Sequence, residues 1–163
     1  MSSKETIQQS LTLSDMVVNK YLDGLKPEAF SLRPVAGMNH LAWQMGHLLS
    51  NENNWMEAIK PGASPALPAG FHEQHAKETH DKGPDAFRTK DEYLALWKAQ
   101  RAATQQILAG LSEADLEAPC PIERMRSMCP TVAQMMNLAG LHALMHVGQF
   151  VAVRRQEALP IAF

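Results

Sequence analysis

The amino-acid sequence predicts an all-α protein that folds as a four-helix bundle. Two observations lead to this prediction. Apolar residues recur at spacings of three, four and seven residues in four long segments, which is the pattern of amphipathic helices. Strand signals are weak, because β-branched and aromatic residues never alternate over more than a few positions. The 163 residues are the length of one domain, so we expect a single domain over residues 1–163.

The first two helices are predicted from apolar stripes that end near a proline. The first stripe predicts a helix over about residues 3–25, stopped by Lys26 and Pro27. It consists of Ile7, Leu11, Val18, Leu22 and Leu25. The second stripe predicts a helix that is closed by Pro61 and Gly62. It consists of Leu41, Met45, Leu48, Trp55 and Ile59.

A long loop separates the second helix from the third. Residues 60–90 contain four prolines and show neither a helical nor a strand period. Loops of this length in compact domains are usually functional or mobile. From Asp91 a third stripe predicts a helix to about Leu111, with Arg101 at one of its apolar positions. The stripe consists of Leu94, Trp97, Thr104, Leu108 and Leu111.

The fourth helix follows a second loop, residues 112–130, and is expected to run from its N-cap Thr131 to about Gln156. Residues 127–153 contain no charged side chain, a length that could cross a bilayer. Several residues in this run would be costly in lipid: Pro130, Gln134, Asn137, His142, His146 and Gln149. We therefore expect a core helix of the bundle and no membrane partner.

Composition excludes one class of partner and suggests a compartment. Fifteen Lys and Arg stand against 17 Asp and Glu, a net charge of -2, so no basic field exists to bind nucleic acid. No apolar stretch follows the charge near the N-terminus, which predicts a cytoplasmic protein without a secretory signal. Cys120 and Cys129 lack the CxxC spacing of a redox pair and are expected to be thiols.

Two histidines on the fourth helix carry the main chemical signal. His142 and His146 are four residues apart, so their side chains leave one face of the helix about 40° apart. This spacing suits two ligands of one metal ion. The alternative is a pair of hydrogen-bonded core histidines. The charge-free helix favours a metal, because buried imidazoles need a partner and a metal accepts both ring nitrogens. Gln149 lies between the two histidines in angle.

The second helix offers a third ligand. His40 and His47 are seven residues apart and share one side of the helix, with Asn51 near the same line. His47 is the better candidate, because it lies in the helix interior while His40 lies at its start. Three neutral nitrogen ligands would leave coordination positions open for water or substrate. Trp43, about 40° from His47, is a candidate wall of the site.

Three histidines of the loop and one carboxylate of the second helix are further candidates for the site. His72, His75 and His80 lie in the polar stretch of the 60–90 loop and are expected to be solvated, although one of them could fold over the site as a lid. Glu52 is the one carboxylate near the site that could serve as a general base. The interpretation we favour pairs it with Arg101 instead.

Four sequence motifs resemble the DinB/YfiT-like superfamily of metal-binding four-helix bundles. They are GHL at 46–48, PTV at 130–132, HALMHVGQ at 142–149 and RRQEALPIAF at 154–163. The resemblance covers nearly the whole chain and implies an up-down-down-up bundle that pairs as a homodimer. It also implies that His47, His142 and His146 bind a divalent ion and that Gln149 lies near it. The family commonly has glycine before the Leu-Pro of the tail, where this chain has Ala158.

Two functions follow from the ligand pattern and the resemblance. The leading hypothesis is an enzyme in which a bound divalent ion, zinc or nickel, activates a low-molecular-weight thiol or water for attack on a small electrophile. Such a protein would be a thiol S-transferase or a hydrolase. The resemblance includes transferases that use bacillithiol, mycothiol or glutathione. The alternative is a non-catalytic, metal-binding, dimeric stress-response scaffold.

Overall fold

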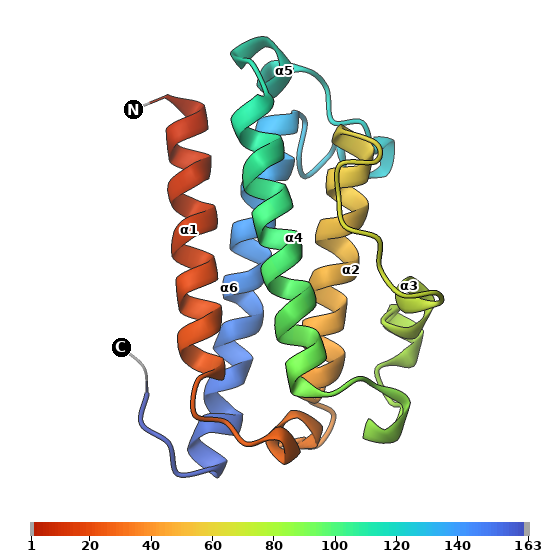
Figure 1. Cartoon of the computed structure of the whole chain (residues 1–163), viewed down its shortest axis with the longest axis vertical. Helices are drawn as coiled ribbons and strands as arrows, with labels where there is room; N and C mark the ends of the chain where they lie inside the picture. The colour runs from red at the N-terminus through yellow and green to blue at the C-terminus, as the bar shows by residue number, and fades with distance from the viewer. Residues whose placement is uncertain (1, 162–163) are drawn as a thin grey trace.

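The computed structural model describes residues 2–161. Four long helices form the body of the protein (Figure 1). They are α1 (Ser3–Leu22), α2 (Leu41–Ile59), α4 (Lys90–Gly110) and α6 (Val132–Gln156). Within residues 2–161 no strand is present, and the all-α prediction is confirmed. Ala162 and Phe163, the last residues of the RRQEALPIAF motif, lie outside the described residues.

The helices are arranged up, down, down and up, as the resemblance implied. In Figure 1, α1 and α6 run in one direction, and α2 and α4 run in the other. The α1 and α6 helices therefore pack in parallel: a side chain at Gly140 would meet Ser10, and Arg154 donates to the carbonyl of Tyr21. Because α2 and α4 are also parallel, the segment between them must cross the length of the bundle. Figure 1 shows this crossover passing beside α2.

Helix boundaries follow from local capping. Thr131 accepts a hydrogen bond from the backbone of Gln134, and the Gln134 side chain accepts one in return, so α6 begins where expected. The α1 helix ends at Leu22 rather than near Leu25. Gly24 adopts a φ of 72°, a left-handed conformation that cannot continue a right-handed helix and that glycine adopts without steric cost.

The two connecting segments contain more structure than the sequence predicted. The crossover, residues 60–89, includes the one-turn helix α3 (Phe71–Gln74) and 3-10 turns at Lys77–Thr79 and Pro84–Ala86. The second connection, residues 111–131, includes α5 (Glu113–Glu117) and a 3-10 turn at Glu123–Met125. A further 3-10 turn, Pro27–Ser31, joins α1 to α2. Elements this short present too few turns to show an apolar period.

The core helix α6 packs against α1 and α2. It is long and apolar enough to cross a membrane by length and composition, yet 44% of that window is buried inside the bundle. A single helix of this length and composition is weak evidence for a membrane span, because core helices of bundles pass the same test. Methionine fills much of the interior, where Met45, Met56, Met135 and Met136 are fully buried. Its flexible thioether side chain suits irregular gaps between helices.

Candidate metal centre

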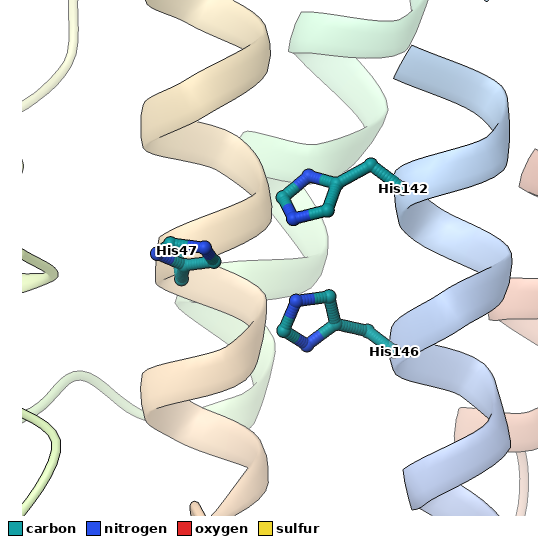
Figure 2. A group of neighbouring side chains, drawn as sticks. All are labelled: His47, His142 and His146. Atoms are coloured by element: carbon teal, nitrogen blue, oxygen red, sulfur yellow. The ribbon is translucent and has the colours of Figure 1, made fainter. Parts of the chain in front are cut away.

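Three histidines from two antiparallel helices converge between α2 and α6. Figure 2 shows His47 on α2 facing His142 and His146 on α6. One nitrogen from each ring lies within 4.8 Å of the others. Nitrogen ligands at about 2.1 Å from one tetrahedral ion lie about 3.4 Å apart, so small side-chain rotations would bring all three to one ion. The three residues together could hold a divalent metal.

Burial keeps these histidines neutral. Desolvation, reinforced by the neighbouring imidazoles, lowers the pKa of His146 to about 3. Desolvation and the nearby His47 lower the pKa of His142 to about 4. The pKa of His47 is lowered as well, chiefly by desolvation. Neutral imidazole is the form that binds a metal, so the site presents its ligands in the required protonation state at neutral pH.

A glutamine on α2 orients His146. The Nδ1 atom of His146 lies 3.0 Å from Oε1 of Gln44, and the Gln44 amide nitrogen donates to the carbonyl of Asn39 at 2.7 Å. The second bond fixes which end of the amide faces the histidine, so His146 Nδ1 carries the proton and Nε2 is left as the ligand. Gln44 lies three residues before His47 on the same side of α2, but no pattern in the sequence singles it out.

The crossover orients His47 in the same manner. Nδ1 of His47 lies 3.3 Å from the carbonyl oxygen of His75, which places the proton on Nδ1 and leaves Nε2 as the acceptor nitrogen. Trp43 stacks on the His47 ring, with centroids 4.6 Å apart and planes inclined by 11°. The Asn51 amide lies 3.1 Å from His47 Nε2 and donates to the His47 carbonyl at 2.9 Å. One face of the His47 ring and both of its nitrogens are therefore positioned by neighbouring groups.

His75 is buried, and the expectation of a solvated loop histidine is wrong at this position. Its side chain is 1% exposed and lies against Gly46. Its Nδ1 donates to the Phe71 carbonyl at 2.7 Å, and its Nε2 accepts from the Tyr93 hydroxyl at 2.7 Å. Desolvation lowers the pKa of His75 to about 4. This histidine fastens the crossover to α2 and α4.

The other two loop histidines differ from each other. His72 is partly buried, and its Nδ1 lies 2.8 Å from the hydroxyl of Ser50 on α2. His80 is exposed, as expected for a loop residue. Neither lies in the triad. The sequence alone gave no means of separating the three, because each lies in the same polar stretch.

A family comparison agrees with this geometry. The model of a family described as the DinB superfamily matches residues 10–150. The chain belongs to the DinB superfamily. No curated protein matches the chain. Membership in the DinB superfamily and the three converging histidines together indicate a metal-binding protein.

Two further residues, His40 and Gln149, are candidates for the surroundings of the metal site in this DinB-superfamily chain. His40 is the N-cap of α2, where its Nδ1 accepts from the backbone of Trp43 at 3.0 Å. The Gln149 side chain makes no hydrogen bond to any of the described residues, whereas Gln44 lies at hydrogen-bond distance from His146.

Glu52 is engaged in a buried ion pair. Its Oε2 lies 3.2 Å from Arg101 Nε, and its Oε1 accepts from the Thr104 hydroxyl at 2.7 Å. Arg101 also donates to Ser14 Oγ and to the carbonyl of Ala139. Burial raises the pKa of the Glu52 carboxyl, while the Arg101 charge opposes the rise. The network joins α2, α4, α1 and α6, which favours the structural interpretation over a general base.

A cavity of about 320 Å³ adjoins the triad at His47. Its wall continues along α2 through Ser50, Asn51 and Asn54 and is completed by the crossover. Its size falls at the lower end of the range for small-molecule sites. The DinB-superfamily bundle thus combines a nitrogen ligand set with space for a small molecule beside one of the ligands.

Proposed function

We propose that this protein is a metal-dependent enzyme in which His47, His142 and His146 bind a divalent ion, zinc or nickel. The ion would serve a reaction between a low-molecular-weight thiol, or water, and a small electrophile, as in a thiol S-transferase or a hydrolase. A bound ion of this kind lowers the pKa of a thiol from about 8.5, or of water from about 15.7 toward 7, which supplies a nucleophile at neutral pH.

The observation that carries the proposal is the orientation of the ligands by outer partners. Gln44 holds the Nδ1 proton of His146, and the His75 carbonyl holds that of His47. Each bond leaves Nε2 without a proton, the form in which it can bind a metal. Such outer hydrogen bonds are typical of histidines that bind metals. Trp43 covers one face of His47 and limits the access of water from that side.

The cavity beside His47 favours an enzyme over a non-catalytic scaffold. An ion that only fastened α2 to α6 would need no accessible space next to its ligands. Three protein ligands leave at least one coordination position open, and the cavity adjoins that ligand set. A small thiol or electrophile has room to approach the site along α2.

Metal analysis provides the first test. Protein purified without a nickel column should contain close to one zinc or nickel ion per chain, and His142→Ala should lose it. The metal-loaded protein is then incubated with bacillithiol, mycothiol, glutathione or no thiol and with a panel of small electrophiles. Turnover that depends on both metal and His142 supports the proposal. No rate above the His142→Ala control with any nucleophile would favour the scaffold.

The proposed assembly is a cytoplasmic homodimer that binds a small-molecule substrate, without nucleic-acid or membrane partners. Four large apolar side chains on the parallel helices α1 and α6 are exposed and support the dimer: Leu13, Met16, Leu141 and Met145. Sedimentation equilibrium should give twice the mass of the chain. The Met145→Glu variant should sediment with the mass of a single chain. Met128→Glu, at an exposed apolar residue outside both helices, is the matched control and should leave the dimer intact.

A further inference from the structure

We infer that the cavity beside His47 binds a small molecule that carries an oxyanion group, either a carboxylate or a phosphate. The inference rests on the proposed function, because it names the class of substrate that the metal centre would act on. Three features of the cavity lead to it: its position next to a metal ligand, the cations in its wall, and the hydrogen-bond donors between them.

The position of the cavity links it to the triad. His47 belongs both to the ligand set and to the cavity wall. Buried His75 forms part of the same wall and carries the carbonyl that orients His47. A molecule in the cavity therefore contacts the residues that position the proposed ion.

Two cations from distant parts of the chain meet at the cavity. Lys77 comes from the 3-10 turn of the crossover, and Arg124 comes from the turn at Glu123–Met125 before α6. Among residues 2–161 neither side chain forms an ion pair; the ion pairs present are Arg88–Glu92 and Arg101–Glu52. Glu78 is the one carboxylate in the lining, so the wall carries a surplus positive charge in a chain whose net charge is -2.

Neutral donors complete the wall. Nδ1 of His72 lies 2.8 Å from the Ser50 hydroxyl and 3.3 Å from the Asn54 amide nitrogen, so it acts as the acceptor of both. The proton of neutral His72 is then on Nε2, which is a donor. Guanidinium, ammonium and imidazole N–H groups are the donors that bind carboxylate and phosphate oxygens. The chemistry of the wall thus matches an oxyanion.

This arrangement orients a bound molecule. Its oxyanion end would lie at Lys77 and Arg124, and its other end would lie toward His47 and Asn51. A substrate held in this way presents its reactive atom to the metal centre.

The test measures binding of succinate and, in a separate arm, inorganic phosphate by calorimetry and amide NMR shifts. Both metal-loaded and metal-free protein are titrated, because the cations bind an oxyanion whether or not the ion is present. We expect saturable binding of at least one probe, with amide shifts centred on Ser50, Asn51 and Lys77. Arg124→Gln and Lys77→Gln should each weaken it about tenfold, the factor expected for loss of one charged hydrogen bond.

The controls are Arg155→Gln and Lys98→Gln, which remove exposed cations of the same types outside this cavity. These variants should bind the probe as the natural chain does. Binding that is unchanged in both cavity variants, shifts that map elsewhere, or no saturable binding of either probe would overturn the inference. Metal content is measured in parallel. If the natural chain binds the anion but contains no metal, the proposed function is rejected and the anion site is not.

Discussion

His75 fills the space that a side chain at Gly46 would occupy. A Cβ atom at position 46 would lie 2.0 Å from His75 Nε2, much closer than atoms can approach. The glycine on α2 thus forms a notch for a histidine of the crossover, and the carbonyl of that histidine reaches His47.

Gly46→Ala should therefore expel His75 from the notch. We expect a loss of about 1–3 kcal/mol in the free energy of unfolding, the usual cost of overpacking, together with weaker metal binding. Urea unfolding and a competitive zinc titration measure the two effects. Gly148→Ala is the matched control, because a Cβ there meets nothing within 4 Å, and it should leave both quantities unchanged or slightly raise stability. Unaltered zinc affinity in Gly46→Ala would contradict the role of His75.

The metal-free protein should lose stability as the pH falls. The pKa values of His142 and His146 in the folded chain are about 4 and about 3, whereas an unfolded histidine titrates near about 6.5. The unfolded chain binds protons first, so stability is complete above pH 7 and declines from about pH 6.5 toward pH 4.

The expected slope is about 1.4 kcal/mol per pH unit for each buried histidine that stays neutral. Urea unfolding of the metal-free protein at pH 8, 6 and 5 measures this slope. At pH 8 the metal-free protein should keep its helical circular dichroism. His80→Ala, which removes an exposed histidine, should show the same slope. Stability that does not change between pH 7 and 5 would show that the imidazoles are not buried in the neutral form.

Removing one partner of the Glu52–Arg101 pair should be strongly destabilising. Arg101→Met would leave a buried carboxylate without its cation, at a cost of about 3–5 kcal/mol. The double variant Glu52→Leu with Arg101→Met should recover most of the loss in chemical unfolding, because no unpaired charge remains. Glu52→Gln should keep the zinc affinity of the natural chain. A selective loss of turnover in folded, zinc-loaded Glu52→Gln would instead identify Glu52 as a general base.

Gln44→Leu should weaken metal binding without unfolding the bundle. It removes the acceptor that orients His146, and loss of such a partner costs about 10–100-fold in metal affinity. Gln149→Leu serves as the control, because Gln149 is close in sequence to His146 yet its side chain has no hydrogen bond to any of the described residues. A competitive chelator titration compares the two variants. Equal affinities would contradict the assignment of Gln44.

Ala158→Gly should stabilise the tail. Ala158 has a φ of 53° and is the one non-glycine residue between positions 2 and 161 with a positive φ. The left-handed conformation costs a residue with Cβ about 1–2 kcal/mol, while glycine loses about 0.5–1 kcal/mol through greater backbone entropy. We expect a net gain of about 0.5–1 kcal/mol in thermal unfolding. Ala152→Gly, inside α6, should instead destabilise by about 1 kcal/mol.

Much of the bundle could be predicted because the signals for each helix lie within the helix itself or at its ends. Apolar spacing located α1, α2, α4 and α6 to within a few residues, and Thr131 located the start of α6. His142 and His146 lie on one face by helix geometry alone. The direction of His47 toward them required only that α2 pack against α6.

The remaining parts of the site depend on relations between distant segments. The burial of His75 follows from the absence of a side chain at Gly46, and nothing in the sequence around His75 indicates it. The role of Gln44 depends on its bond to Asn39 and on the depth at which His146 lies between helices. The cavity likewise combines Lys77 and Arg124, which no periodic pattern connects.

The parallel pairing of α2 and α4 leaves the crossover with length to spare. The 19 residues of α2 span about 28 Å, a distance that about nine extended residues could cover. Residues 60–89 exceed this minimum by about twenty. The surplus folds into α3 and its neighbouring turns, which carry His72, His75 and Lys77 to the site. Sequence change in this surplus could therefore reshape the wall of the cavity beside His47 while the helices and the histidine triad stay the same.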